Sequence, residues 1–78
     1  REARASWAAV LSAEFEALRR RLAQGESGLI DAYAATDAAE FFAVVSEHFF
    51  EQPAALAAAH PALYAEFVRC YGTDPRHW

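Results

Sequence analysis

The stretch from residue 37 to residue 51 constrains the fold most, because its apolar residues recur with the period of an α-helix. Thr36 or Asp37 can cap this helix, and Glu40 follows Asp37 at the spacing of a capping box. Pro53 ends the pattern, since a proline inside a helix removes a hydrogen bond and clashes with the preceding turn. The stretch therefore predicts a helix over residues 37–51.

One face of this predicted helix is acidic. At about 100° per residue, the residues that share this face are Glu40, Val44, Glu47 and Glu51. The residues expected opposite to it are Phe42, Val45 and Phe49. A helix with apolar residues around most of its circumference is expected at the centre of a fold. Two interpretations of the acidic face remain open: it is solvated, or one of its carboxylates faces a metal or a base.

The remainder of the chain also has the pattern of helices and loops, without strands. The segments expected are a helix over 4–23, a loop over 24–32 with Gly25 at the helix end, a short Ala-rich helix over 53–59, a last helix over 61–71 that ends at Gly72, and a fraying tail over 73–78. We therefore predict an all-α fold of about four helices.

Three further side chains have structural interpretations. Trp7 is expected to anchor the core or an interface, because it belongs to the apolar stripe of the first helix. His48 lies between aromatic residues and is expected to be packed and hydrogen-bonded. Cys70 lies in the apolar stripe of the last helix and is expected to act as an inert small hydrophobe.

The composition is rich in apolar residues for so short a chain. Of the 78 residues, 55% are hydrophobic and 14% are aromatic, whereas a lone domain of this size buries only about 60% of its unfolded surface. A single Cys excludes an intramolecular disulfide. The chain also begins without Met. We therefore expect residues 1–78 to be a single piece of a larger protein, with a core completed by further sequence, a partner chain or self-association.

Charge and hydropathy exclude two classes of partner. The net charge is −4, and the only basic cluster is the run over 19–21 near the end of the first helix, so nucleic-acid binding is not expected. No apolar run approaches the roughly 20 residues that a membrane span requires. The unpaired Cys favours a cytoplasmic location.

Most of the chain from residue 29 to residue 75 resembles the C-terminal signature of the Mlc titration factor A family of zinc peptidases. The residues that carry the resemblance are Tyr33-Ala34, the run over 37–44, Glu47, the run over 49–53, and the later runs over 60–64 and 71–75. The resemblance is a long, ungapped run of mixed residue types, which makes it specific.

The resemblance implies a role for two residues, and helix position suggests one for a third. In that family two His of a helical HExxH motif and a Glu from a later helix hold the metal, which assigns Glu40 as the third zinc ligand. A Tyr seven residues earlier points into the site, which assigns Tyr33 as the donor to an oxyanion. Glu47, two turns after Glu40, is expected to orient a ligating His from outside the coordination shell, and it is also the competing candidate for the ligand.

The implied activity is that of a zinc-dependent peptidase of aminopeptidase type, with a peptide substrate. The family name also implies a glucose-responsive transcriptional repressor as a partner. No HExxH occurs in the 78 residues, so we expect this C-terminal helical part of a zincin-type domain to be inactive alone, with the HExxH part upstream.

Three alternatives stay open. The chain can be a non-catalytic helical protein-interaction module, in which case the excess aromatic surface would bind a protein. Glu40, Glu47 and His48 can bind a metal within the chain, although their angular spread argues against it. Tyr33 can be a half-buried packing residue whose hydroxyl bonds to the backbone.

Overall fold

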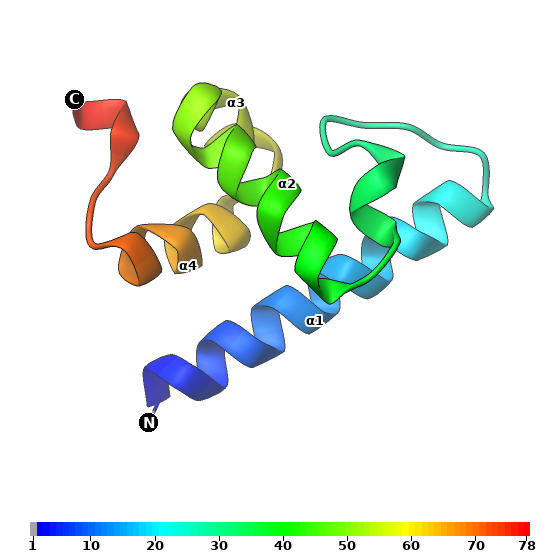
Figure 1. Ribbon diagram of the computed structural model, residues 1–78, viewed down its shortest axis with the longest axis horizontal. Helices are drawn as coiled ribbons and strands as arrows, with labels where there is room; N and C mark the ends of the chain where they lie inside the picture. The colour runs from blue at the N-terminus through cyan, green and yellow to red at the C-terminus, as the bar shows by residue number, and fades with distance from the viewer. Residues whose placement is uncertain (1) are drawn as a thin grey trace.

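The computed structural model describes residues 2–78, with side chains from Arg4 onward, and confirms the all-α fold (Figure 1). The four α-helices are α1 (Glu2–Ala23), α2 (Ala38–Glu51), α3 (Pro53–Ala59) and α4 (Pro61–Tyr71). Two short 3₁₀ helices are η1 (Ala32–Ala35) and η2 (Pro75–His77). No strand occurs within residues 2–78.

The helix ends follow local chemistry that the sequence predicts. Asp37 is the cap of α2, and its Oδ1 accepts the backbone N–H of Glu40 at 2.9 Å. Pro53 and Pro61 lie in the first turn of α3 and α4, where no helical N–H donor is lost. Gly72 ends α4 in the left-handed conformation at φ 71°, which a glycine adopts without steric cost.

The buried face of α2 shares Val45 and Phe49 with the face expected from sequence but contains Phe41 in place of Phe42. Phe41, Val45 and Phe49 are the buried residues of α2, whereas Phe42 is 36% exposed. The three buried residues are four positions apart and so lie along one line of the helix. Periodicity identified the apolar residues, but the neighbouring helices decide which of them becomes central: Phe15 of α1 packs edge-on against Phe41.

The core lies where α2, α4 and the middle of α1 meet. Its buried hydrophobic members are Leu18, Ile30, Ala34, Phe41, Val45, Phe49, Leu56, Leu63, Tyr64 and Phe67. Figure 1 shows α1 crossing the N-terminal end of α2, with its N-terminal half beside α4 and its C-terminal half near η1. Two polar contacts join α1 to the C-terminal half of the chain: Ser6 Oγ donates to the buried Glu66, and Glu14 Oε1 lies 3.0 Å from His60 Nδ1.

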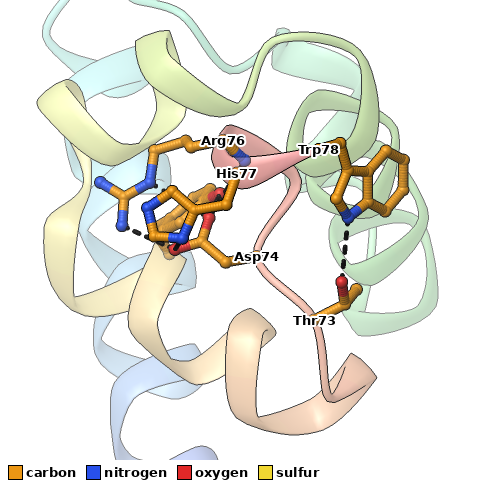
Figure 2. Close-up of polar contacts among 6 residues, drawn as sticks. Thr73, Asp74, Arg76, His77 and Trp78 are labelled. Atoms are coloured by element: carbon orange, nitrogen blue, oxygen red, sulfur yellow. Dashed lines mark hydrogen bonds and ion pairs between the residues drawn. The ribbon is translucent and has the colours of Figure 1, made fainter.

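The C-terminal segment over 73–78 is ordered, so the prediction that it frays is wrong. Asp74 Oδ1 accepts a hydrogen bond from the Tyr64 hydroxyl at 2.5 Å, and Asp74 Oδ2 accepts one from Arg76 Nη2 at 2.9 Å. The Trp78 indole N–H donates to Thr73 Oγ1 at 2.9 Å (Figure 2). These local bonds fold the segment into η2, a turn that its composition alone does not predict.

Several aromatic rings remain exposed on the face formed by α2 and α4. We call this set the aromatic strip; its members are Phe42 (36% exposed), Phe50 (39%), Tyr71 (39%) and Trp78 (76%). Tyr71 connects them, with ring centroids 6.4 Å from Phe42 and 4.9 Å from Phe50. Within residues 4–78, α2 supplies Phe41, Val45 and Phe49 to the core, as expected of a central helix, but its Phe42 and Phe50 remain exposed.

Three other expectations can be checked in the described range. Trp7 packs against Phe42 and Phe67, as expected for a core anchor. Cys70 is exposed, so the prediction that it packs as a small hydrophobe is wrong; the buried line of α4 runs through Leu63 and Phe67 instead. Among the described helices, none has the length and hydropathy required to cross a bilayer.

Candidate functional site

Tyr33 is presented to solvent by a short segment that is fixed to the core on both sides. Ile30 is 4% exposed and Ala34 is fully buried, which anchors the chain immediately before and after Tyr33. Asp31 Oδ1 accepts the Tyr33 backbone N–H at 2.8 Å and caps η1. The Tyr33 side chain is 60% exposed. The alternative that Tyr33 is a half-buried packing residue is therefore wrong.

An open groove lies beside Tyr33, between the loop before η1 and the middle of α2. We call it the Tyr33 groove. Its lining residues are Gly28, Leu29, Asp31 and Tyr33 from the loop and η1, and Val44, Glu47 and His48 from α2. Its cavity volume is ≈ 590 Å³. A concave site of this size with both apolar and polar walls is of the kind that binds small molecules or peptide ends.

Glu40 lies on the same face of α2 as this groove but is not part of its lining. It occupies the first turn, one turn before Val44, and its side chain is half-buried. Its backbone is held by the cap bond to Asp37. Among the residues that the structure describes, no ion pair or side-chain hydrogen bond occupies its carboxylate. The carboxylate is thus available to a ligand.

Glu47 and His48 form the α2 wall of the Tyr33 groove. Glu47 is exposed and His48 is half-buried. The Nδ1 atom of His48 lies 3.3 Å from Gln52 Oε1, one turn later in the helix. His48 is therefore hydrogen-bonded, as expected, but it lies on the wall of a groove instead of between packed aromatic rings.

No group of three His, Cys, Asp or Glu side chains within the described part of the chain is arranged to hold a metal ion. Glu40, Glu47 and His48 therefore do not form a ligand set by themselves. A carboxylate such as that of Glu40 has the donor chemistry of a zinc ligand, but a hydrolytic zinc site uses three protein ligands. The described residues could supply one protein ligand of such a site, and the other two ligands would have to come from residues elsewhere.

The ionisable groups with shifted pKa values lie away from the Tyr33 groove. The Ser6 hydroxyl lowers the pKa of Glu66 most, and Arg69 adds to this effect against the opposing effect of burial. Burial raises the pKa of Tyr64, and its hydrogen bond to Asp74 raises it further. These groups join α1 to α4 and α4 to η2. Their shifts are therefore explained by structural contacts.

The loop side of the groove was not identified as functional from sequence. Gly28, Leu29 and Asp31 line the groove beside Tyr33. Only Asp31 carries a local signal: an Asp two residues before a backbone N–H that it caps is typical of a turn. No residue pattern indicates that this turn faces the middle of α2.

Comparison with known proteins identifies one family. The family described as "Glucose-regulated metallo-peptidase M90" matches residues 1–72. The protein "Mlc titration factor A" of Edwardsiella ictaluri (strain 93-146) is 45% identical over 73 residues, which is 91% of this chain and 28% of that protein. The protein of the same name from Cronobacter sakazakii (strain ATCC BAA-894) is 56% identical over 52 residues, which is 65% of this chain and 20% of that protein.

The chain thus spans under a third of the length of these curated relatives. No solved structure matches it. The matched region contains Tyr33, Glu40 and Glu47, together with all the residues that line the Tyr33 groove.

Proposed function

The chain belongs to the glucose-regulated metallo-peptidase M90 family, and we propose that the complete protein is a zinc-dependent peptidase of the aminopeptidase type. The observation that carries this proposal is the family match over residues 1–72, which includes both Tyr33 and Glu40. The family description supplies a metal-dependent peptidase. The proposal adds three things to this description: that the metal is zinc, that the peptidase is of the aminopeptidase type, and that individual residues have the roles given below.

Glu40 would be the third zinc ligand. Three observations support this role: the carboxylate is half-buried, no described residue occupies it, and the Asp37 cap fixes the backbone that carries it. A ligand on a rigid element holds its position better than a ligand on a mobile loop. When bound, zinc would lower the pKa of a coordinated water and polarise the substrate carbonyl.

Tyr33 would donate a hydrogen bond to the oxygen that becomes negative when water adds to the scissile carbonyl. Its hydroxyl can serve as a donor because the side chain is exposed beside a groove. Its backbone is held by Asp31 and by the buried residues on either side, so the ring starts from a fixed position. Preorganised donors of this kind contribute most when they need not move during the reaction.

The base that takes the proton from the attacking water would come from outside this chain. No HExxH occurs in the 78 residues, so the chain alone would lack two metal ligands and the general base. We propose that the 78-residue chain has no peptidase activity by itself.

Substitutions in the complete protein test these roles. Glu40→Ala should remove bound zinc, measured by elemental analysis, whereas Glu51→Ala, an exposed carboxylate on the same helix, should retain it. Tyr33→Phe should lower kcat by about 100- to 1,000-fold, the usual effect of losing one oxyanion donor, with zinc content unchanged. Full zinc occupancy in Glu40→Ala, or a normal kcat in Tyr33→Phe, would contradict the respective assignment.

A second candidate function is a non-catalytic helical module that binds another protein. The aromatic strip favours it, since contiguous exposed aromatic rings are typical of protein-binding surfaces. Under either proposal a glucose-responsive transcriptional repressor is the expected partner; the relatives are named Mlc titration factor A. Titration calorimetry of the complete protein with such a repressor tests the binding, and Phe50→Ser should weaken it if the strip is the surface. Repressor binding without zinc-dependent hydrolysis would favour the second function.

A further inference from the structure

The Tyr33 groove combines two kinds of wall. Two carboxylates, Asp31 and Glu47, line it, and neither Arg nor Lys is among its lining residues. Leu29 and Val44 give it an apolar part, and both are half-buried and packed against the core. A groove with this lining fits a ligand that carries a positive charge beside an apolar group.

We propose that the Tyr33 groove receives the N-terminal residue of the peptide substrate, with Glu47 binding its α-ammonium group and with Leu29 and Val44 contacting its side chain. This inference rests on the proposed aminopeptidase function. It assigns Glu47 a substrate contact in place of the role of orienting a metal ligand.

Glu47 is the carboxylate of the groove that no described side chain or backbone group contacts. Asp31 Oδ1 already accepts the Tyr33 backbone N–H at 2.8 Å, and His48 Nδ1 lies against Gln52. Within residues 4–78, Glu47 has no ion pair and no side-chain hydrogen bond. An α-ammonium group carries three donors, and a charge-assisted bond to a carboxylate is stronger than one between neutral groups.

The spacing along α2 also suits two separate roles for its carboxylates. Glu40 and Glu47 share one face and are two turns apart, about 10 Å along the helix axis. One residue of an extended peptide spans about 3.5 Å. The interval therefore accommodates a terminal residue and its hydrogen-bond partners between the proposed metal ligand and Glu47.

Gly28 leaves room for the side chain of that residue. A Cβ placed on Gly28 would meet no atom within 4 Å, and its φ lies outside the left-handed region. A larger residue at this position would therefore be tolerated without a clash at Cβ and without straining the backbone. This gives a steric probe of the groove that is independent of charge.

The first test uses the complete protein and two substrates, L-leucine p-nitroanilide and 4-methylpentanoyl p-nitroanilide, which lacks only the α-amino group. Glu47→Gln should raise KM for the leucine substrate by about 10- to 100-fold, the range for a lost bond to a charged group, with a much smaller change in kcat. It should leave zinc content and the rate on the uncharged substrate unchanged. Glu51→Gln, one turn later and outside the groove, should behave as the wild type.

Three results would overturn the inference. They are an unchanged KM in Glu47→Gln, an equal loss on both substrates, and a loss of zinc, which would instead assign Glu47 to holding a metal ligand. A wild-type protein that binds zinc and hydrolyses no aminoacyl substrate would refute the proposed function itself, and the inference with it.

The second test separates the apolar wall from the charge. Gly28→Leu should raise KM for L-leucine p-nitroanilide more than KM for L-alanine p-nitroanilide, because the added side chain shortens the groove. An equal effect on both substrates would show that the N-terminal side chain does not lie there.

Discussion

Replacing Asp37 with Ala removes one hydrogen bond at the start of α2, the bond from the Glu40 N–H to Asp37 Oδ1 at 2.9 Å. The main-chain bond from the Phe41 N–H to the Asp37 carbonyl, 3.0 Å long, does not depend on the side chain and remains. The substitution therefore tests the cap alone, in the turn that carries the proposed zinc ligand.

The expected magnitude follows from the exposure of the cap. Replacing a capping side chain with Ala costs about 0.5–2 kcal/mol, and this cap bond is exposed, so we expect about 1 kcal/mol. Asp37→Asn keeps an acceptor oxygen and loses only the favourable interaction of a negative charge with the helix dipole, about 0.3 kcal/mol or slightly more. The free energy of unfolding should therefore be highest for the wild type, lower for Asp37→Asn and lowest for Asp37→Ala.

The same loss predicts an effect on the metal. A cost of about 1 kcal/mol, if borne by the first turn alone, raises the unwound population of that turn about fivefold. Zinc affinity, measured by competition with a chelator, follows the fraction of molecules in which the turn is wound, so it should fall by less than that factor in Asp37→Ala and by less still in Asp37→Asn. Stability is measured by urea denaturation of the zinc-free complete protein.

Two outcomes would refute the reasoning at different steps. Equal stabilities of the Ala and Asn variants would show that the side-chain bond contributes nothing to α2. A fall in zinc affinity well beyond fivefold in Asp37→Ala would show that Asp37 acts on the metal by a route other than the cap.

Two further predictions concern the contacts outside the groove. The Ser6 hydrogen bond keeps the pKa of Glu66 below its ordinary value. The contribution of ionised Glu66 to the free energy of unfolding should therefore be present at neutral pH and be lost as the pH falls below about 4. Urea denaturation should show a smaller loss of stability in acid for Glu66→Gln than for the wild type. Asp74→Asn removes the charge that holds Arg76, so trypsin should cleave after Arg76 faster than in wild type, as followed by mass spectrometry; an unchanged rate would show that the ion pair does not order η2.

The helix boundaries could be predicted because they are fixed by residues in the same turn. Pro53, Pro61 and Gly72 restrict backbone geometry whatever surrounds them, and Asp37 satisfies an N–H in its own turn. The exposed and buried aromatic residues were less predictable. Phe41 and Phe42 have equal hydrophobicity, yet Phe41 is 2% exposed and packs on Phe15, whereas Phe42 is 36% exposed although it contacts rings of α1 and α4.

Contacts between distant segments could not be predicted from sequence. His60 Nδ1 lies 3.0 Å from Glu14 Oε1, across 46 positions of the chain, and no local pattern pairs these two residues. Glu66 looks like a surface residue in an amphipathic pattern, yet it is 3% exposed because Ser6 and Arg69 satisfy its carboxylate. Such pairs depend on how helices dock, which periodicity does not specify.

The candidate site was likewise predictable from sequence only in part. Tyr33 and Glu40 were selected by family resemblance and Glu47 by its position on the same helix face as Glu40, and the roles of all three remain proposals. The structure adds the loop wall, since Gly28, Leu29 and Asp31 face α2 only after η1 has packed against it. The charge and size of the groove therefore follow from tertiary packing and could not be derived from residue spacing.

The core of α2 also determines where its proposed functional face points. Phe41, Val45 and Phe49 are buried along one line, and this fixes the rotation of the helix about its axis. Glu40 precedes Phe41, and Val44 precedes Val45, so each is turned about 100° from the buried line, toward the side where η1 packs. A change that rotates α2 in the core would therefore move the proposed ligand and the groove wall together. Core substitutions in α2 are for this reason expected to affect catalysis as well as stability, even though none of the buried residues touches the groove.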